Sequence, residues 1–351
     1  MTDNDIAESL QNQVSQAIEK NEHLIVRAGG SKDFYGRSVE GNELNIAKHQ
    51  GIINYEPTEL VITARAGTPL KTIEKQLSDN NQMLAFEPPR FSNSATLGGT
   101  IACNLSGPRR AYSGAARDYV LGTKIINGKA EILSFGGEVM KNVAGYDVSR
   151  LMAGSMGTLA VLLEVSLKVV PRPETEITLV QNTNIKQALE NLHHWSNQGL
   201  PITASCFHQG QLSIRLSGTE KTINTIQQSL GGEILSHSNS FWHSIKEQSH
   251  IFFDSKKTLW RISLASNSAV FSADKETLYE WGGALRWVKS DSIEDQISDS
   301  LNGHSTLFRS SSNRDKVFQV LPKSILQIHR HLKQAFDPHG IFNIGRMYPE
   351  I

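Results

Sequence analysis

The chain has 351 residues, of which 38% are hydrophobic and 20% charged, and 35 basic residues balance 35 acidic ones. This length is enough for two domains, and the even charge argues against the broad basic surface of nucleic-acid-binding proteins. The two cysteines, Cys103 and Cys206, cannot hold an iron–sulfur cluster, which takes about four thiolates, and no HExxH motif indicates a metal site.

The segments of this sequence do not have the character of a signal peptide or of a membrane-spanning helix. The polar residues 1–20 lack the basic start and apolar run of a signal peptide. The longest hydrophobic stretch, 159–170, is interrupted by Glu164 and Lys168, and it is shorter than the roughly 20 apolar residues of a membrane span. These features predict a buried strand and a cytoplasmic protein. A peripheral position on the inner face of the cytoplasmic membrane, reached through a complex, is the alternative.

The first 80 residues predict a small α/β unit. Residues 3–20 have the period of an amphipathic helix, and a strand over 23–27 runs into a glycine cluster. A strand over 60–64 precedes a helix over 70–79, in which Thr68 is expected as the cap and Pro69 as the first residue.

Residues 86–122 are rich in Gly, Pro, Ser and Asn and have neither helical nor strand periodicity. This composition predicts a loop, and a loop of this length inside a compact domain is typically functional. Strands are expected at 123–127, 132–135 and 159–170. The Pro171-Arg172-Pro173 segment then marks a domain boundary.

Beyond residue 174 the expected order is βαββαβ, which is the ferredoxin-like pattern. A second, less regular repeat of this order is predicted, with strands in TLWRISLAS, GALRWVKSD and STLFRSS. A short helix would follow the first of these strands, and SIEDQISDSLNG would precede the last. The two halves would join into one antiparallel sheet with helices on one face. The predicted class is α+β, with domains at 1–173 and 174–323. A helix and tail over 324–351 would return to the first domain.

Three clusters of glycines are candidates for a ligand-binding site. Consecutive glycines in the first, at 28–32, allow backbone N–H groups to form an anion-binding nest, although a tight turn is the alternative. The second begins with Thr96-Leu97-Gly98-Gly99 and continues through Asn104 to residues 114–119. The third, at 154–158, precedes a strand and lacks GxGxxG spacing, which disfavours a Rossmann nicotinamide site.

In this order the clusters resemble the FAD-binding domain of the vanillyl-alcohol oxidase and p-cresol methylhydroxylase (PCMH-type) superfamily, within it the D-lactate and glycolate dehydrogenase branch. The resembling segments are AGGSK at 28–32, TLGGT at 96–100, GAARDYVLG at 114–122, KNVAGYD at 141–147 and GSMGT at 154–158. Other segments, among them GPRRAYSG, WGGALRW and the closing FNIGRMYPE, are similar to the small FAD-binding subunits of bacterial glycolate oxidases.

This resemblance implies a PCMH-type FAD-binding domain of two α/β subdomains, followed by a ferredoxin-like antiparallel cap domain. The pattern of histidines and cysteines indicates no metal site, and the lack of a histidine in the first loop favours non-covalent FAD. The first loop would hold the pyrophosphate, the Thr96 segment would approach it from the other side, and residues near 114 and 157 would meet the adenosine. The implied cofactor residues are Ala28, Gly29, Gly30, Ser31, Lys32, Thr96, Leu97, Gly98, Gly99, Asn104, Gly114, Ala115, Ala116, Asp118, Gly157 and Val161.

Oxidation of a 2-hydroxy acid needs a cation for the carboxylate and a base for the hydroxyl proton. Arg109 and Arg346, with Arg110 and Arg286 as further arginines, are candidates for the cation, and His304 is the candidate base. Each also fits a structural or surface role. The C-terminal GDGNxH segment of related D-2-hydroxy-acid dehydrogenases does not occur, and residues 301–309 come nearest to it.

The resemblance therefore implies an FAD-binding subunit of a glycolate oxidase, which converts glycolate to glyoxylate. Electrons would pass through FAD to an iron–sulfur subunit and a quinone, and a larger FAD-binding catalytic subunit would complete the complex. Two alternatives remain open. One is a stand-alone FAD-dependent D-2-hydroxy-acid dehydrogenase, and the other is a mainly structural flavin-binding assembly subunit.

Overall fold

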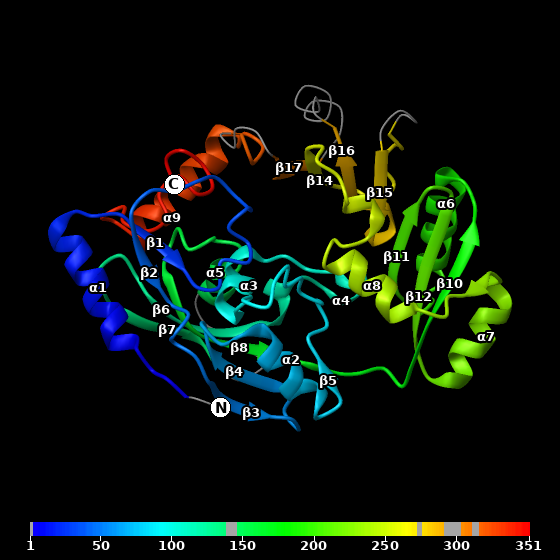
Figure 1. Cartoon of the computed structure of the whole chain (residues 1–351), viewed down its shortest axis with the longest axis horizontal. Helices are drawn as coiled ribbons and strands as arrows, with labels where there is room; N and C mark the ends of the chain where they lie inside the picture. The colour runs from blue at the N-terminus through cyan, green and yellow to red at the C-terminus, as the bar shows by residue number, and fades with distance from the viewer. Residues whose placement is uncertain (1–2, 138–145, 272–275, 291–302, 311–315) are drawn as a thin grey trace.

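The structure, a computed structural model, describes residues 3–137, 146–271, 276–290, 303–310 and 316–351. The N-terminal half and the residues that follow 174 form two bodies that lie side by side, and the C-terminal segment, drawn in red, returns to the N-terminal half (Figure 1). Helices and antiparallel sheets occur in both bodies, so the predicted α+β class is confirmed.

The N-terminal half begins with a helix and a small parallel strand pair. Helix α1 (Ala7–Lys20) buries Leu10, Val14 and Ala17 along one face, as its hydrophobic period predicts. Strand β1 (Leu24–Arg27) pairs with β2 (Asn42–Asn45). The first glycine cluster follows β1 directly, so the loop that it starts lies at the end of this strand pair.

A five-stranded antiparallel sheet in the order β3-β4-β8-β6-β7 forms the larger core of this half. Its central strand β8 (Val161–Lys168) is the predicted buried strand, and Glu164, which interrupts the hydrophobic run, pairs with Lys124 at 3.0 Å. The other strands are β3 (Ile52–Glu56), β4 (Val61–Arg65), β6 (Val120–Ile126) and β7 (Ile132–Gly136), and a separate pair comprises β5 (Gln82–Met83) and β9 (Val170–Pro171).

The predicted cap of helix α2 (Leu70–Ser78) is wrong. Pro69 occupies the N-cap position, and Thr68 makes no cap hydrogen bond. The Thr68 hydroxyl instead accepts the Gly51 N–H at 2.9 Å and donates to the Gly51 carbonyl at 3.2 Å. A long-range contact thus uses the hydroxyl that local reasoning assigned to the helix.

Residues 86–122 are not a plain loop, contrary to the prediction. They include the helices α3 (Leu97–Cys103) and α4 (Arg110–Ser113) and the 3-10 helix η1 (Ala116–Tyr119). These helices are too short for a hydrophobic period to show in the sequence. Helix α5 (Val148–Met152), which Asp147 caps, also belongs to this half.

The second body is built on an eight-stranded sheet in the order β13-β10-β12-β11-β15-β16-β14-β17. Its first half has the expected βαββαβ order with β10 and β12 adjacent in the middle, which is the ferredoxin-like arrangement. These elements are β10 (Thr175–Asn182), α6 (Ile185–Asn197), β11 (Ile202–His208), β12 (Gln211–Gly218), α7 (Glu220–Leu230) and β13 (Glu233–Ile234).

The second half of this sheet differs from the prediction in one element. The expected strands form as β14 (Leu259–Leu264), β16 (Leu285–Lys289) and β17 (Gly303–Arg309). Where the short helix was expected, the described residues form strand β15 (Glu276–Glu280) and the single turn η3 (Trp281–Gly283), because β15 pairs with both β11 and β16. All but the last residue of SIEDQISDSLNG lie outside the described residues.

Helices cover both faces of the sheet, not one as expected. Helices α6 and α7 pack on the face that carries Leu179, whereas Trp242 of α8 (Ser238–Lys246) donates to Thr178 on the opposite face at 2.7 Å. The face of the sheet that α8 covers also carries the 3-10 helix η2 (Ile251–Phe253). The hydrophobic cluster on this face includes Tyr35 and Met156 of the N-terminal half. This face therefore packs against the glycine-rich body.

Helix α9 (Lys323–Phe336) and the tail lie on the N-terminal half (Figure 1). Lys333, which is buried, donates to the carbonyls of Thr158 and Phe342 at 2.6 and 2.8 Å and to Asp337 at 2.7 Å. Phe342 forms a bridge beside Leu24 at the start of β1. These contacts bring the end of the chain to the first glycine loop.

Candidate cofactor site

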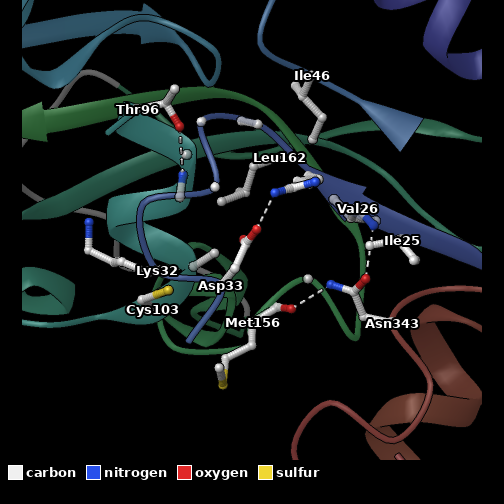
Figure 2. A pocket seen from close by; sticks show the side chains of 18 of the residues that line it. Ile25, Val26, Lys32, Asp33, Ile46, Thr96, Cys103, Met156, Leu162 and Asn343 are labelled. Carbon is white, nitrogen blue, oxygen red and sulfur yellow. Dashed lines mark hydrogen bonds and ion pairs between the residues drawn. The ribbon is translucent and has the colours of Figure 1, made fainter. Parts of the chain in front are cut away.

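One cavity of about 360 Å³ brings the three glycine clusters together. It lies between the end of β1, the start of α3 and the turn before β8 (Figure 2). The residues that matter for its chemistry are Arg27, Ala28, Gly29, Gly30, Ser31, Lys32, Asp33, Thr96, Gly98, Gly99, Cys103, Ser155, Met156, Gly157, Asn343 and Arg346.

The first loop approaches its surroundings so closely that side chains are excluded. A Cβ on Gly29 would lie 1.6 Å from the carbonyl oxygen of Ser94, which only glycine avoids. Gly30 has φ of +67°, in the left-handed region that favours glycine. The backbone of this loop therefore forms one wall of the cavity without side-chain cover.

The second cluster opens helix α3. The Thr96 hydroxyl accepts the Gly99 N–H at 3.3 Å, and a Cβ on Gly98 would lie 2.7 Å from the Cβ of Ala66. Gly98 is required by this contact with Ala66, which follows β4, and both glycines line the cavity. Close packing of α3 thus sets the second wall.

The C-terminal tail fixes the third cluster to β1. Asn343 accepts the Val26 N–H at 2.8 Å and donates from Nδ2 to the Met156 carbonyl at 2.7 Å (Figure 2). A Cβ on Gly157, where φ is +71°, would lie 2.7 Å from that Nδ2 atom. One buried amide therefore joins three segments that are far apart in the sequence.

Lys32 supplies a buried cation beside the first loop. Its side chain is almost fully buried, its ammonium lies 3.4 Å from the Ser31 hydroxyl, and it stacks 5.8 Å from the Phe91 ring centroid. Burial lowers the pKa of Lys32. Arg27, which also lines the cavity, forms ion pairs with Asp33 and Glu43, so its positive charge is balanced.

The other residues that the resemblance implies for the cofactor do not line the cavity. Leu97 and Val161 are buried in the hydrophobic core. Asn104 accepts the Arg117 N–H at 3.1 Å, and Asp118 accepts the Ala115 N–H at 2.8 Å. The segment Gly114, Ala115, Ala116 and Asp118 is thereby tied to the end of α3, outside the cavity lining.

The three candidate catalytic residues do not meet. Arg109 is buried in a second cavity of about 510 Å³, where it pairs with Glu87 and Glu176. Burial raises the pKa of Glu87, but Arg215 and Arg109 outweigh this and lower it. His304 is exposed on the sheet's edge strand β17.

Arg346 lines the first cavity but is used structurally. Its guanidinium donates to the carbonyls of Tyr35, Arg37 and Asp33 at 2.6, 2.9 and 3.2 Å. It therefore holds the far end of the first loop in place. Of the other arginines considered, Arg286 is fully buried and donates to the Ala269 and Ser268 carbonyls.

Sequence reasoning missed Asn343 and Cys103 as lining residues. Cys103 follows the glycines of α3 by one helical turn, and burial raises the pKa of its thiol. Asn343 stands in the closing FNIGRMYPE segment, whose resemblance to glycolate oxidase subunits does not indicate a place in the cavity. No local pattern shows that both residues line the same cavity as the loop after β1. Of the KNVAGYD segment, residues 141–145 lie outside the described residues.

Within the described ranges, no three His, Cys, Asp or Glu side chains gather as a metal ion would require. Over the same residues, no helix combines the length and the apolar character needed to cross a bilayer.

The family profile described as "FAD binding domain" matches residues 6–136. Over 350 residues, which are 99% of both chains, the sequence is 47% identical to "Glycolate oxidase subunit GlcE" of Escherichia coli (strain K12). It is 34% identical over 160 residues to "Glycolate oxidase subunit GlcD" of Bacillus subtilis (strain 168), which covers 44% of this chain and 34% of that protein.

A solved alkyldihydroxyacetonephosphate synthase is similar in fold, with a TM-score of 0.67 at 15% identity. The similarity covers 96% of this chain and 75% of that one. At this identity the similarity shows the fold alone.

Proposed function

This chain belongs to the family of the glycolate oxidase subunit GlcE, and on that premise we propose that it is the FAD-binding subunit of a glycolate-oxidising complex. The reaction is the oxidation of glycolate to glyoxylate. The observation that carries the proposal is the convergence of three glycine clusters on one cavity. A cavity of this size, with bare backbone on its walls, suits a dinucleotide.

The lining residues fit FAD by their chemistry. The backbone N–H groups of Ala28, Gly29, Gly30 and Ser31 and the ammonium of Lys32 suit the negative pyrophosphate. Thr96, Gly98, Gly99 and Gly157 would complete the contacts, while Leu97, Asn104, Gly114, Ala115, Ala116, Asp118 and Val161 support them from behind. When bound, FAD supplies the acceptor for a hydride from the substrate.

The FAD is held without a covalent bond. The loop at 28–32 has no histidine, and Cys103, whose pKa burial raises, is poorly suited to act as a thiolate. Acid precipitation of the purified chain is expected to leave all flavin in the supernatant. Flavin that stays with the protein pellet after full denaturation would show a covalent link.

Electrons leave this subunit for partners. The chain has two cysteines in all, so the iron–sulfur clusters of such a route must belong to another subunit, next to a larger FAD-binding catalytic subunit. This arrangement places the protein in the cytoplasm and at the membrane only peripherally, through the complex. We also assign residues 1–173 to the FAD domain, 174–323 to the cap and 324–351 to a tail on the FAD domain.

An assay of the isolated chain tests how much of the site it holds. Glycolate and D-lactate are supplied with a dye that accepts electrons, once with the chain alone and once with the whole complex. Turnover by the chain alone indicates a complete active site. Turnover by the complex alone indicates that this FAD relays electrons or supports the assembly.

Substitution of Gly30 separates the redox role from the assembly role. A Cβ at this position would lie 3.0 Å from Arg27 and 3.1 Å from Asp33, and φ is +67°. Gly30→Leu is expected to lose flavin and activity while the complex still assembles. A complex that contains Gly30→Leu, lacks this flavin and remains fully active would contradict the redox role.

A further inference from the structure

Trp281 stands where the cap meets the glycine-rich half. Its indole N–H donates to the Gly107 carbonyl at 3.0 Å, and the ring is buried. The guanidinium carbon of Arg110 lies 4.5 Å from the ring centroid, and that of Arg261 lies 5.3 Å from it. Two cations, one from each body, therefore contact the same indole.

Neither arginine forms an ion pair with a described carboxylate, although Asp118 and Glu280 lie near enough to raise the pKa of Arg110 and Arg261, respectively. No ion pair or hydrogen bond joins the Arg110 or Arg261 side chain to any described group. Burial lowers the pKa of both, and the nearby Arg261 lowers that of Arg110 further. Both arginines are half-buried, and cations withdrawn from water are normally paired, so this place favours the binding of an anion.

A small cavity beside Arg261 also offers hydrogen-bond acceptors. It measures about 20 Å³ and is lined by Ser106, Gln248, Arg261, Glu280 and Trp287, among others. The Gln248 Oε1 atom is buried there and has no partner. Glu280 accepts the Trp287 indole N–H at 2.7 Å on one oxygen. The space is the size of one water molecule, so a larger ligand enters only when the side chains of its wall move.

This cavity is next to the proposed FAD cavity. Phe91 lines it and also stacks on Lys32 of the FAD cavity. Leu105 lines it too, two residues after Cys103, which faces the FAD cavity. Tyr35 lies near enough to both Arg261 and Cys103 for each to influence its pKa, which burial raises. A thin wall of side chains thus separates the two spaces.

We propose that Arg261 binds the carboxylate of a small 2-hydroxy acid in this space and that Gln248 accepts the hydrogen bond of its hydroxyl group. The inference rests on the proposed function, because that function supplies a ligand with both groups. Arg110 is a positioning residue that holds the indole and strengthens the positive potential. Glu280 lines the same space and is its acidic group among the lining residues.

Calorimetric titration with glycolate and acetate tests the site. The two anions share the carboxylate, but acetate lacks the hydroxyl. The chain is used as purified, after its FAD content is measured, and any flavin is reduced with dithionite so that no turnover occurs. Wild-type protein is expected to bind glycolate more tightly than acetate.

The variants separate the two contacts. Arg261→Gln is expected to weaken both anions about 10- to 100-fold, the usual loss for a charge-assisted hydrogen bond. Gln248→Leu should weaken glycolate alone and remove its preference over acetate. Arg330→Gln, which changes an exposed arginine, is the matched control and should alter neither.

The results that would overturn this inference differ from those that would contradict the proposed function. Equal glycolate binding by Arg261→Gln and wild type, or no binding by an FAD-loaded wild type, overturns this inference alone. A folded chain that takes up no FAD contradicts the proposed function instead. If Arg261→Gln fails to fold, the glycolate preference of Gln248→Leu decides, and retention of that preference overturns the inference.

Discussion

At the scale of single residues, Arg346 illustrates how a charged group in a cofactor cavity can serve the backbone. Its guanidinium donates to three carbonyls between residues 33 and 37 and so fixes the end of the first loop. Lysine cannot reproduce this planar set of donors. Arg346→Lys is therefore expected to weaken FAD binding about tenfold, equal to the loss of one strong hydrogen bond.

Fluorescence titration with FAD measures this effect. Arg330→Lys, at an exposed arginine paired with Glu350 near the same tail, provides the control and should bind FAD as wild type does. If Arg346→Lys binds FAD normally but loses turnover, Arg346 acts on the substrate, as the sequence first indicated.

Glu280 predicts a pH effect on stability. Burial raises its pKa from 4.5 to about 7 in the folded chain. Between pH 4.5 and about 7 the folded protein holds a proton on Glu280 that the unfolded chain releases. The free energy of unfolding therefore falls as the pH rises through this range. Glu280→Gln should therefore raise the unfolding free energy by about 3 kcal/mol near pH 8, and by little below pH 4.5.

Denaturant unfolding of wild type and Glu280→Gln across this pH range tests the sign. Gln keeps an oxygen for the Trp287 indole N–H, so the charge is the main change. A difference that stays constant with pH, or that grows toward acid, would contradict a raised pKa.

At the scale of elements, the tail depends on one buried ion pair. Lys333→Met removes the cation and leaves the buried Asp337 carboxylate with only the N–H groups of Ile341 and Phe342. Breaking a buried pair in this way costs about 3–5 kcal/mol. Because the tail carries Asn343 and Arg346, FAD affinity should fall as well.

Lys75→Met is the matched control, since Lys75 and Asp79 form the same i,i+4 pair at the surface. Its cost in unfolding free energy is expected to stay below about 0.5 kcal/mol. Equal losses for the two variants in denaturant unfolding would show that the buried pair has no special role.

The elements also show how far the sequence predicts this structure. Helix α1, strand β8 and the βαββαβ unit were predicted because each carries its own hydrophobic period. The helices within 86–122 are too short to show one, and β15 forms through its pairing with β11 and β16. The glycines of the candidate site were found because backbone geometry restricts their residue type. The role of Asn343 depends on long-range contacts that no local pattern shows.

At the scale of the whole molecule, the cofactor cavity depends on segments from both ends of the chain. The loop after β1, the start of α3, the turn before β8 and the tail after α9 all line it. Among the described residues, the cap does not line this cavity, but it packs against Tyr35 and against Met156, which lines it. FAD should therefore stabilise the N-terminal half and the tail together, by an amount that grows with its concentration.

FAD titration of the purified chain tests the central claim most directly, with Gly29→Ala as the variant and Gly218→Ala as its control. A Cβ on Gly29 would clash with the Ser94 carbonyl, whereas one on Gly218 would make an ordinary contact 3.7 Å from Ile223. We predict that wild type and Gly218→Ala saturate with a single FAD and that folded Gly29→Ala does not. A folded wild-type chain that is colourless and takes up no FAD would contradict the account.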